Sequence, residues 1–205
     1  MTFFIELNYC LMNPFEVNRM NVLVTGGAGF IGSHVVLNLT QKRKLSVLNI
    51  DKLSYGSNLE YLAPCKENYT FVKEDIVNKS SMKSIFHEFK PNLVLHLAAE
   101  SHVDRSIENP DDFLKSNVEG TVSLLKASLD YWDAAKNPTD FRFVHVSTDE
   151  VYGCLGLEDP AFTEESQYQP NSPYSASKAA SDLFVRSWHK TYGLPTIITH
   201  CSNNY

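Results

Sequence analysis

The chain alternates short apolar segments, typical of buried strands, with longer segments that have the composition of helices. Six segments are near-continuously apolar and rich in Val, Ile and Leu: 21–25, 45–50, 69–74, 92–98, 141–147 and 195–200. Strands of this kind are typical of a parallel sheet covered by helices. The helices are expected over 30–41, 80–90, 109–135 and 172–193. The order strand, helix, strand predicts an α/β fold with a doubly wound parallel sheet.

Local signals mark where some of these elements end. Ser80 or Ser81 is the expected cap of the second helix, and Pro91 stops it. The last helix is expected to end at Gly193. The polar, proline-containing segment 156–173 predicts a long loop, and such loops in compact domains are usually functional or mobile.

The composition narrows the class of protein. At 205 residues, 43% apolar and 20% charged, the chain can form one globular core. A formal net charge of −6 gives no reason to expect nucleic acid or a membrane as a partner. No apolar run approaches the ~18 residues of a membrane-spanning helix. Cys10, Cys65, Cys154 and Cys201 form no C-x-x-C pair, so we expect reduced thiols, no metal site and a cytoplasmic location.

Two regions are expected. Residues 1–20 form an N-terminal extension, because Met20 stands directly before the first strand and the opening lacks the features of a signal peptide. Residues 21–205 form one nucleotide-binding domain.

A glycine-rich turn follows the first strand. In VTGGAGFIGSH, Gly27, Gly29 and Gly32 satisfy G-x-G-x-x-G, and Gly26 precedes them. Glycines let the backbone approach a pyrophosphate, and the next helix presents N–H groups to it. Asp51 ends the second strand, where a carboxylate can bind the adenosine ribose and repel a 2′-phosphate. The turn therefore predicts a Rossmann-like domain that binds NAD rather than NADP, the alternative being a glycine-rich turn without a ligand.

A tyrosine and a lysine four residues apart, Tyr174 and Lys178, share one face of the last expected helix. An ammonium beside a phenol stabilises the phenolate and is expected to lower its pKa below about 10. The pair can then act as a general base on a hydroxyl group. The alternative is an exposed pair without a role.

Together these motifs resemble the extended short-chain dehydrogenase/reductase family. Within it, the blocks HLAAESHVDRSI, VSTDEVYG, SPYSASKAASD and CSNNY are similar to the dTDP-glucose 4,6-dehydratases. The resemblance covers about Asn21 to Tyr205. In related epimerases and reductases, small hydroxyl residues take the place of the acids Asp149 and Glu150.

The resemblance implies a lyase that converts dTDP-glucose to dTDP-4-keto-6-deoxyglucose and water. Tyr174 takes the C4 hydroxyl proton, helped by Lys178 and Thr148, while the C4 hydride passes to NAD. Glu150 then removes the C5 proton, protonated Asp149 donates to the departing C6 hydroxyl, and the hydride returns to C6. Adjacent carboxylates repel each other, which keeps one of them protonated. The alternative is that the two acids only cap the turn after a strand.

The resemblance also implies binding residues, one position at a time. For NAD they are Gly26, Gly29, Phe30, Ile31, Gly32, Asp51, Lys52, Leu53, Ser54, Asp75, Ile76, Leu97, Ala98, Ala99, Ser116, Tyr174, Lys178 and Asn203. For the sugar nucleotide they are Ser101, Thr148 and Asn204. Asp75 is equally well explained as a cap of a helix or turn.

Other polar and aromatic residues have less defined roles. His102, Asp104 and Arg105 either hold a polar loop or contact substrate, and His200 is expected to be neutral to function. Five aromatic residues are expected to pack in the core or an interface: Tyr131, Trp132, Phe184, Trp188 and Tyr192.

Members of the family continue past CSNNY into a smaller lobe that holds the sugar nucleotide, so the resemblance implies that this C-terminal substrate lobe is missing here. It also implies a homodimer joined through the helices over 110–135 and 173–192. Two alternatives stay open. One is another NAD-dependent sugar-nucleotide epimerase or reductase, and the other is an inactive cofactor-binding fragment.

Overall fold

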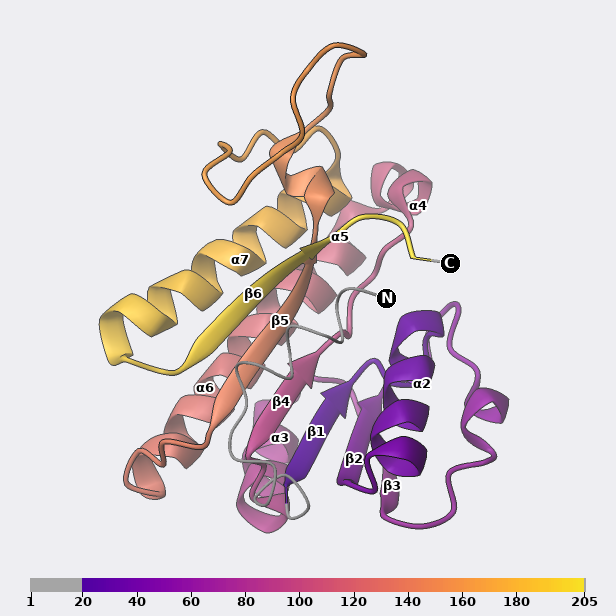
Figure 1. The fold of residues 1–205 in the computed structure, drawn as a ribbon, viewed down its shortest axis with the longest axis vertical. Coiled ribbons are helices and arrows are strands. Elements are labelled where there is room, and N and C mark those ends of the chain that lie inside the picture. Colours follow the sequence, from indigo (N-terminus) through magenta and orange to yellow (C-terminus); the bar gives the residue numbers. More distant parts are fainter. Residues whose placement is uncertain (1–19, 205) are drawn as a thin grey trace.

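The computed structural model describes residues 20–204 (Figure 1). The expected extension therefore lies outside the described residues, apart from Met20. The strands are β1 Asn21–Thr25, β2 Ser46–Asp51, β3 Tyr69–Lys73, β4 Leu93–His96, β5 Arg142–Thr148 and β6 Thr196–Cys201. The α-helices of six or more residues are α2 Phe30–Leu37, α3 Lys79–Phe89, α4 Val103–Glu108, α6 Gly120–Ala134 and α7 Pro173–Tyr192. Short helical segments are η2 Asn38–Lys42, η3 Leu59–Leu62, α5 Pro110–Phe113, η4 Leu114–Glu119 and η5 Asp149–Tyr152.

All six strands form one parallel sheet in the order β3-β2-β1-β4-β5-β6. The chain winds outward from β1 to β3 and then returns to β4 on the other side of β1, so the strand order reverses between β1 and β4. This is the predicted doubly wound sheet. Ligands of such sheets bind beyond the carboxyl ends of the strands at that reversal.

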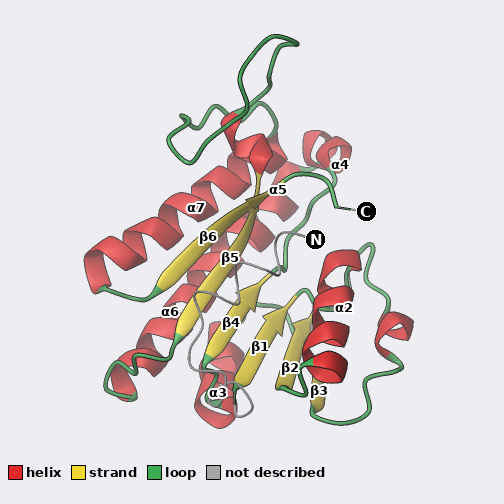
Figure 2. Cartoon of the chain, in the orientation of Figure 1, coloured by secondary structure: helices red, strands yellow, loops and turns green. Residues whose placement is uncertain are grey.

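Alternate strand residues face two separate apolar clusters. Leu23 faces a cluster formed with α3, α6 and α7, whereas its neighbours Val22 and Val24 face a second cluster formed with α2 and η3. The cartoon shows the same arrangement, with α2 on one face of the sheet and α3, α6 and α7 on the other (Figure 2). Helices on both faces bury the strands, as their apolar sequences predict.

Several expected boundaries differ from the structure. The expected helix over 109–135 is divided into α5, the π-helical η4 and α6, and α4 is a helix that the sequence analysis did not predict. The cap of α3 is Asn78, whose side chain accepts the Ser81 N–H, so the expected Ser80 or Ser81 cap is wrong. By contrast, α7 ends at Gly193 with φ of 75°, as predicted. The expected loop is present as a largely irregular segment between η5 and α7 (Figure 1).

Candidate functional site

The glycine-rich turn between β1 and α2 is so closely packed against backbone atoms that side chains do not fit at Gly26 or Gly32. A Cβ on Gly26 would lie 2.6 Å from Ala98 N, and a Cβ on Gly32 would overlap the carbonyl oxygen of Gly26. Gly26 also has φ of 74°, a conformation that favours glycine. No side chain caps the start of α2 after Gly29, so its first N–H groups remain available to an anion.

Asp51, at the end of β2, holds this turn in place. Its Oδ2 accepts the Ala28 N–H at 3.0 Å, and its Oδ1 accepts the Leu53 N–H at 2.8 Å and the Ser57 hydroxyl at 3.1 Å. Two carboxylate oxygens offer about four acceptor positions, so room for one further donor remains. Asp51 therefore organises the turn and can also bind a hydroxyl group in the cleft beside it.

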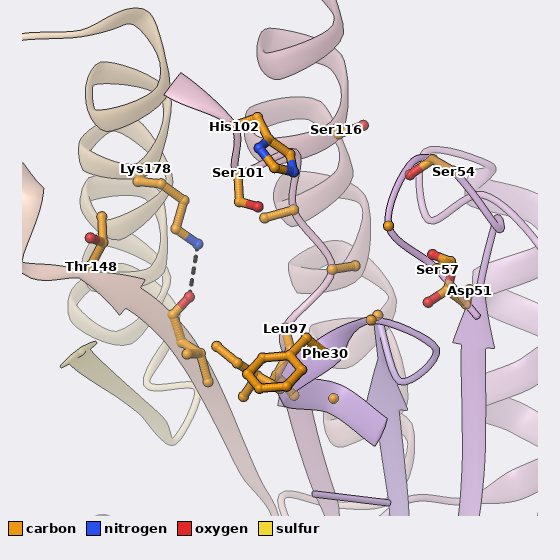
Figure 3. A pocket seen from close by; sticks show the side chains of 18 of the residues that line it. Phe30, Asp51, Ser54, Ser57, Leu97, Ser101, His102, Ser116, Thr148 and Lys178 are labelled. Atoms are coloured by element: carbon orange, nitrogen blue, oxygen red, sulfur yellow. Dashed lines mark hydrogen bonds between the residues drawn. The ribbon is translucent and has the colours of Figure 1, made fainter. Parts of the chain in front are cut away.

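A cleft of about 460 Å³ extends over the carboxyl ends of the strands. Figure 3 shows Thr148 and Lys178 at one end, Asp51 at the opposite end, and Leu97 and Ser101 between them. The expected site residues that line it are Gly26, Gly29, Phe30, Ile31, Gly32, Asp51, Lys52, Ser54, Asp75, Ile76, Leu97, Ala98, Ala99, Ser101, Ser116, Thr148, Glu150, Tyr174, Lys178, Asn203 and Asn204. The structure therefore brings most of the expected cofactor and catalytic residues to one cavity.

Two expected site residues are not in the lining. Leu53 has φ of 61° and directs its N–H to Asp51, and Asp149 lies one residue before Glu150 without lining the cleft. The lining also includes residues that the sequence analysis did not assign to the site, among them Tyr55, Ser57, Glu74, Ser147 and Cys201, and it includes His102, for which a substrate contact was one of the two roles left open. Most of them adjoin assigned positions, so proximity in sequence was the available signal.

Lys178 and Tyr174 lie on the first turns of α7, where Ser172 caps the helix through a reciprocal bond with Ser175. Lys178 is only 4% exposed, and its Nζ donates to the carbonyl oxygen of Val146 at 2.8 Å. That bond places the ammonium against the end of β5, beside the segment that carries the two acids.

The expected lowering of the tyrosine pKa is wrong for this structure. Burial raises the pKa of Tyr174 to about 12, the charge of Glu150 adds to the rise, and a hydrogen bond with Thr148 opposes it. Burial also lowers the pKa of Lys178 to about 8. Burial and the charge of Glu150 thus raise the pKa of Tyr174, contrary to the lowering that the sequence predicted.

The acids Asp149 and Glu150 begin the short helix η5. Thr148 caps it by accepting the Glu150 N–H at 3.2 Å. Burial raises the pKa of Glu150, and the neighbouring charge of Asp149 raises it further. A carboxylate with a raised pKa is a stronger base once ionised, which suits the role expected of Glu150. The repulsion expected between the two acids therefore raises the pKa of Glu150, the expected base.

At the opposite end of the cleft, Glu100 is a buried carboxylate with two cations. Lys52 Nζ lies 3.1 Å from Glu100 and donates to Ser116 at 2.7 Å, while Arg105 lies 3.6 Å from Glu100. The Arg105 guanidinium also stacks 4.8 Å above the Tyr55 ring. Arg105 thus holds the polar loop, which is one of the two roles that the sequence left open for it.

Three polar residues with several partners escaped the sequence analysis. Asn49 accepts the Gly27 N–H from within β2, and Asn117 bonds to both the Glu100 backbone and Ser177. Asp182 is 1% exposed and accepts bonds from Ser147 and Tyr168. A polar residue inside an apolar strand was the signal for Asn49, whereas nothing local marked Asn117 or Asp182.

The sequence analysis expected His200 to have no effect on function. In the structure His200 belongs to the polar network around the buried Asp182. Its Nε2 lies 3.2 Å from Asp182 and 2.9 Å from the Tyr168 hydroxyl, and its Nδ1 lies 3.2 Å from the Tyr152 hydroxyl. His200 therefore connects β6 to α7 and to the loop before it.

Among residues 20–204, no group of three or more His, Cys, Asp or Glu side chains is placed to hold a metal ion. Cys65, Cys154 and Cys201 are free thiols, and Cys10 lies outside the described residues. None of the described helices has the length and hydrophobicity needed to cross a membrane.

Comparison with known proteins identifies close relatives. The chain is 53% identical to the dTDP-glucose 4,6-dehydratase of Haemophilus influenzae over 91% of this chain and 56% of the relative. It is 52% identical to the enzyme of the same name from Neisseria meningitidis, over 90% of this chain and 53% of the relative. The chain thus spans just over half the length of these curated relatives.

Solved structures agree with these sequence matches. The crystal structure of DesIV, a dTDP-glucose 4,6-dehydratase from Streptomyces venezuelae with NAD and TYD bound, superposes with a TM-score of 0.82 at 44% identity, over 91% of this chain and 56% of that chain. UDP-glucose 4-epimerase of Thermus thermophilus, in complex with NAD, superposes with a TM-score of 0.77 at 34% identity, over 88% of this chain and 54% of that chain. The resemblance seen in the sequence is confirmed. Since the family model described as GDP-mannose 4,6 dehydratase matches residues 23–205, the chain belongs to that family.

Proposed function

We propose that this chain carries the cofactor-binding and catalytic part of an NAD-dependent dTDP-glucose 4,6-dehydratase. The observation that carries the proposal is the single cleft that joins the glycine turn and Asp51 to Thr148, Glu150, Tyr174 and Lys178. Relatives of that name are about half identical in sequence across this region. The product would be dTDP-4-keto-6-deoxyglucose and water.

The residues of the cleft fit a dinucleotide. The turn excludes a Cβ at Gly26 and Gly32, which leaves the backbone open to a pyrophosphate, and the uncapped start of α2 supplies N–H donors. The remaining acceptor position of Asp51 suits a ribose hydroxyl and disfavours a 2′-phosphate. Lys52 does not counter this preference, because its ammonium is paired with Glu100.

When bound, NAD would accept the hydride from C4 of the sugar and later return it to C6. Tyr174 would remove the C4 hydroxyl proton, and the ammonium of Lys178 would stabilise the developing phenolate. Filling the cleft with substrate and cofactor changes the charges around Tyr174, whose pKa is about 12 in the ligand-free chain. Thr148, which lines the cleft with Tyr174, would orient the phenol.

Elimination of water needs a base at C5 and an acid at C6. We assign the base to Glu150, because it lines the cleft and its raised pKa strengthens it as a base. We assign the acid to Asp149, which adjoins Glu150 on η5. The C4 ketone makes the C5 proton acidic, so oxidation has to precede elimination.

The remaining expectations complete the proposal. Residues 21–205 would act as one nucleotide-binding domain preceded by an extension, and the enzyme would work in the cytoplasm as a homodimer. Asn203 and Asn204, which follow β6 and line the cleft, would contact the nicotinamide side and the sugar diphosphate. The sugar nucleotide would also contact Ser101 and Thr148.

Deuterium incorporation tests the reaction. The chain is incubated with NAD and dTDP-glucose in deuterated water, and the product is analysed by NMR and mass spectrometry. A dehydratase gives a 4-keto-6-deoxy sugar with deuterium at C5, whereas a C4 epimerase gives a galactose derivative without it. Binding of NAD with no turnover and no binding of dTDP-glucose would instead identify an inactive cofactor-binding fragment. Only the first outcome supports the proposal.

A further inference from the structure

A buried carboxylate lies one helical turn beyond Lys178. Asp182 is 1% exposed, and Ser147 of β5 donates to its Oδ2 at 2.8 Å. The Tyr168 hydroxyl donates to the same oxygen at 3.0 Å, and His200 Nε2 lies 3.2 Å from it. These partners come from a strand, a loop and another strand, so the carboxylate ties three segments to α7.

The other carboxylate oxygen is poorly satisfied. His145 Nε2 lies 3.1 Å from Asp182 Oδ1, but the two atoms form no well-aligned hydrogen bond, and both are fully buried. Leaving a buried carboxylate oxygen in this state costs stability. A neutral carboxamide or hydroxyl group could accept the same bonds as Oδ2, and burying it would cost less free energy than burying a carboxylate. Hydrogen bonding alone therefore does not explain a charged residue at this position.

Lys178 needs a counter-charge that its own hydrogen bond does not provide. Its Nζ donates to the neutral carbonyl of Val146, and no carboxylate of the described chain lies within ion-pair distance of it. A buried ammonium without a compensating charge tends to lose its proton. The negative charge of Asp182 opposes that loss, because it raises the pKa of Lys178 against the effect of burial.

The other titratable groups near Lys178 do not replace Asp182. The titratable groups that couple to Lys178 are His96, His145, Asp182 and Cys201, and His200 lies beside Asp182. The titratable groups that line the same cleft are Tyr174, Glu150, Asp51, Lys52, Tyr55, Glu74, Asp75, His102 and Cys201. Burial lowers the pKa of His145 to about 4 and raises that of Cys201, so both are neutral near pH 7. Glu150 couples to the phenol of Tyr174. Asp182 itself is ionised, because its close contacts with His145 and His200, together with the charge of Lys178, lower its pKa against the effect of burial.

We propose that Asp182 is a positioning residue for the reaction: its buried charge keeps Lys178 in the ammonium form, and its bonds fasten β5, β6 and the loop before α7 around that ammonium. The proposal rests on the proposed function in so far as Lys178 serves the reaction. Asp182 lies outside the cleft lining and would act only through Lys178 and the segments it holds.

The pH dependence of unfolding tests the charge coupling without any activity. The pKa of Lys178 is about 8 in the folded chain against 10.5 as a model value, so the folded state binds this proton less tightly than the unfolded chain. Stability therefore rises as the pH increases past about 8. In Asp182→Asn the rise begins at a pH lower by roughly one unit or more, because the counter-charge is gone.

The experiment is urea unfolding between about pH 6 and about pH 10, so that an onset at about pH 8 in the parent chain and an onset at about pH 7 in the variant both lie inside the range. The parent chain is compared with Asp182→Asn, Lys178→Met and the double variant, and Tyr168→Phe is the matched control that removes one bond but keeps the charge. The variants that carry Lys178→Met contain the same histidines and therefore account for their titration.

The proposal expects the free energy of unfolding of Asp182→Asn to begin its rise at a lower pH than that of the parent chain. Variants that carry Lys178→Met, with or without Asp182→Asn, should show no such rise. Tyr168→Phe should begin its rise at the same pH as the parent chain. An unchanged onset in Asp182→Asn, or an equal shift in Tyr168→Phe, overturns it.

If Asp182→Asn does not fold, the double variant decides the question. A double variant that folds supports the proposal, because Lys178→Met removes the buried ammonium that Asp182→Asn would leave without a counter-charge. Failure of the double variant, with Lys178→Met alone folded, shows that the carboxylate only holds its hydrogen bonds and overturns the proposal. Where the chain turns over substrate, the pH–rate profile of Asp182→Asn moves to lower pH. Absence of turnover in the parent chain contradicts the proposed function but leaves the unfolding test intact.

Discussion

The Ala28 N–H donates to Asp51 Oδ2 at 3.0 Å, which ties the glycine turn to the end of β2. Leu53 and Ser57 donate to the other oxygen, so the carboxylate faces three donors. In Asp51→Asn, the new NH₂ group must face at least one of these donors. We expect a loss of about 2 kcal/mol in the free energy of unfolding and at least about tenfold weaker NAD binding.

Urea unfolding and calorimetric titration with NAD measure the two effects of Asp51→Asn. Ser57→Ala is the control, because it removes a single neutral donor and leaves the carboxylate. We expect it to bind NAD within about threefold of the parent chain, since a neutral hydrogen bond contributes about 1 kcal/mol or less. Unchanged NAD affinity in Asp51→Asn would contradict the role of this carboxylate in the cleft.

Two glycines of the same motif should respond differently to alanine. A Cβ on Gly32 would overlap the Gly26 carbonyl oxygen, whereas a Cβ on Gly29 would lie 3.4 Å from that atom. We expect Gly32→Ala to destabilise the chain by about 2–4 kcal/mol and Gly29→Ala by about 1 kcal/mol or less. Thermal and urea unfolding of both variants provide the measurement. Equal losses would show that the turn relaxes around the added methyl group.

The sheet and the cofactor end of the site could be predicted from the sequence because both depend on local patterns. Strand periodicity, the glycine turn and Asp51 are local patterns, and parallel topology brings the ends of all strands to one edge. Even the Tyr174 and Lys178 pair needs only helical spacing. The doubly wound parallel sheet follows from those patterns without knowledge of side-chain packing. Most of the expected cleft residues came instead from the family resemblance.

The buried polar network could not be predicted in this way. Lys52 meets Ser116, 64 positions away, and Ser147 meets Asp182, 35 positions away, so only the folded chain brings these groups together. In the sequence, Asp182 is indistinguishable from an acid on a solvated helix face. The same limit explains the error for Tyr174, because its pKa depends on how deeply folding buries the phenol.

Variants at Tyr174 and Glu150 should separate the two chemical stages of the proposed reaction. Tyr174→Phe keeps the ring but removes the base, so we expect loss of oxidation at C4 and a fall in kcat of about 10²–10⁴. Glu150→Gln keeps the hydrogen-bonding shape but removes the base at C5, so reduced cofactor should form without release of the 4-keto-6-deoxy sugar. Near-ultraviolet absorbance follows the reduced cofactor, and NMR follows the product. Normal product formation in Glu150→Gln would contradict its assignment.

A homodimer would have to cover exposed apolar side chains on α7. Leu183 is 58% exposed and Tyr192 is 51% exposed, and Tyr192 packs edge-to-face against Trp188 with ring centroids 5.5 Å apart. We expect Leu183→Glu to convert the dimer to a monomer, because it places a charge in an apolar contact. Size-exclusion chromatography with light scattering measures the mass. Leu157→Glu is the control, since Leu157 is fully exposed on the loop before α7, and an equal effect there would contradict the α7 interface.

His145 should make the chain sensitive to mild acid. Burial, followed by the charge of Lys178, lowers its pKa from 6.5 to about 4, so the unfolded chain takes up this proton first as the pH falls. Stability is therefore lost between about pH 6.5 and about pH 4, and the contribution of His145 is about 3 kcal/mol. His96, whose pKa is also lowered by burial, adds to the loss. In His145→Gln, which has no proton to gain, urea unfolding across this range should show a clearly smaller loss, and an undiminished loss would show that other groups control the acid sensitivity.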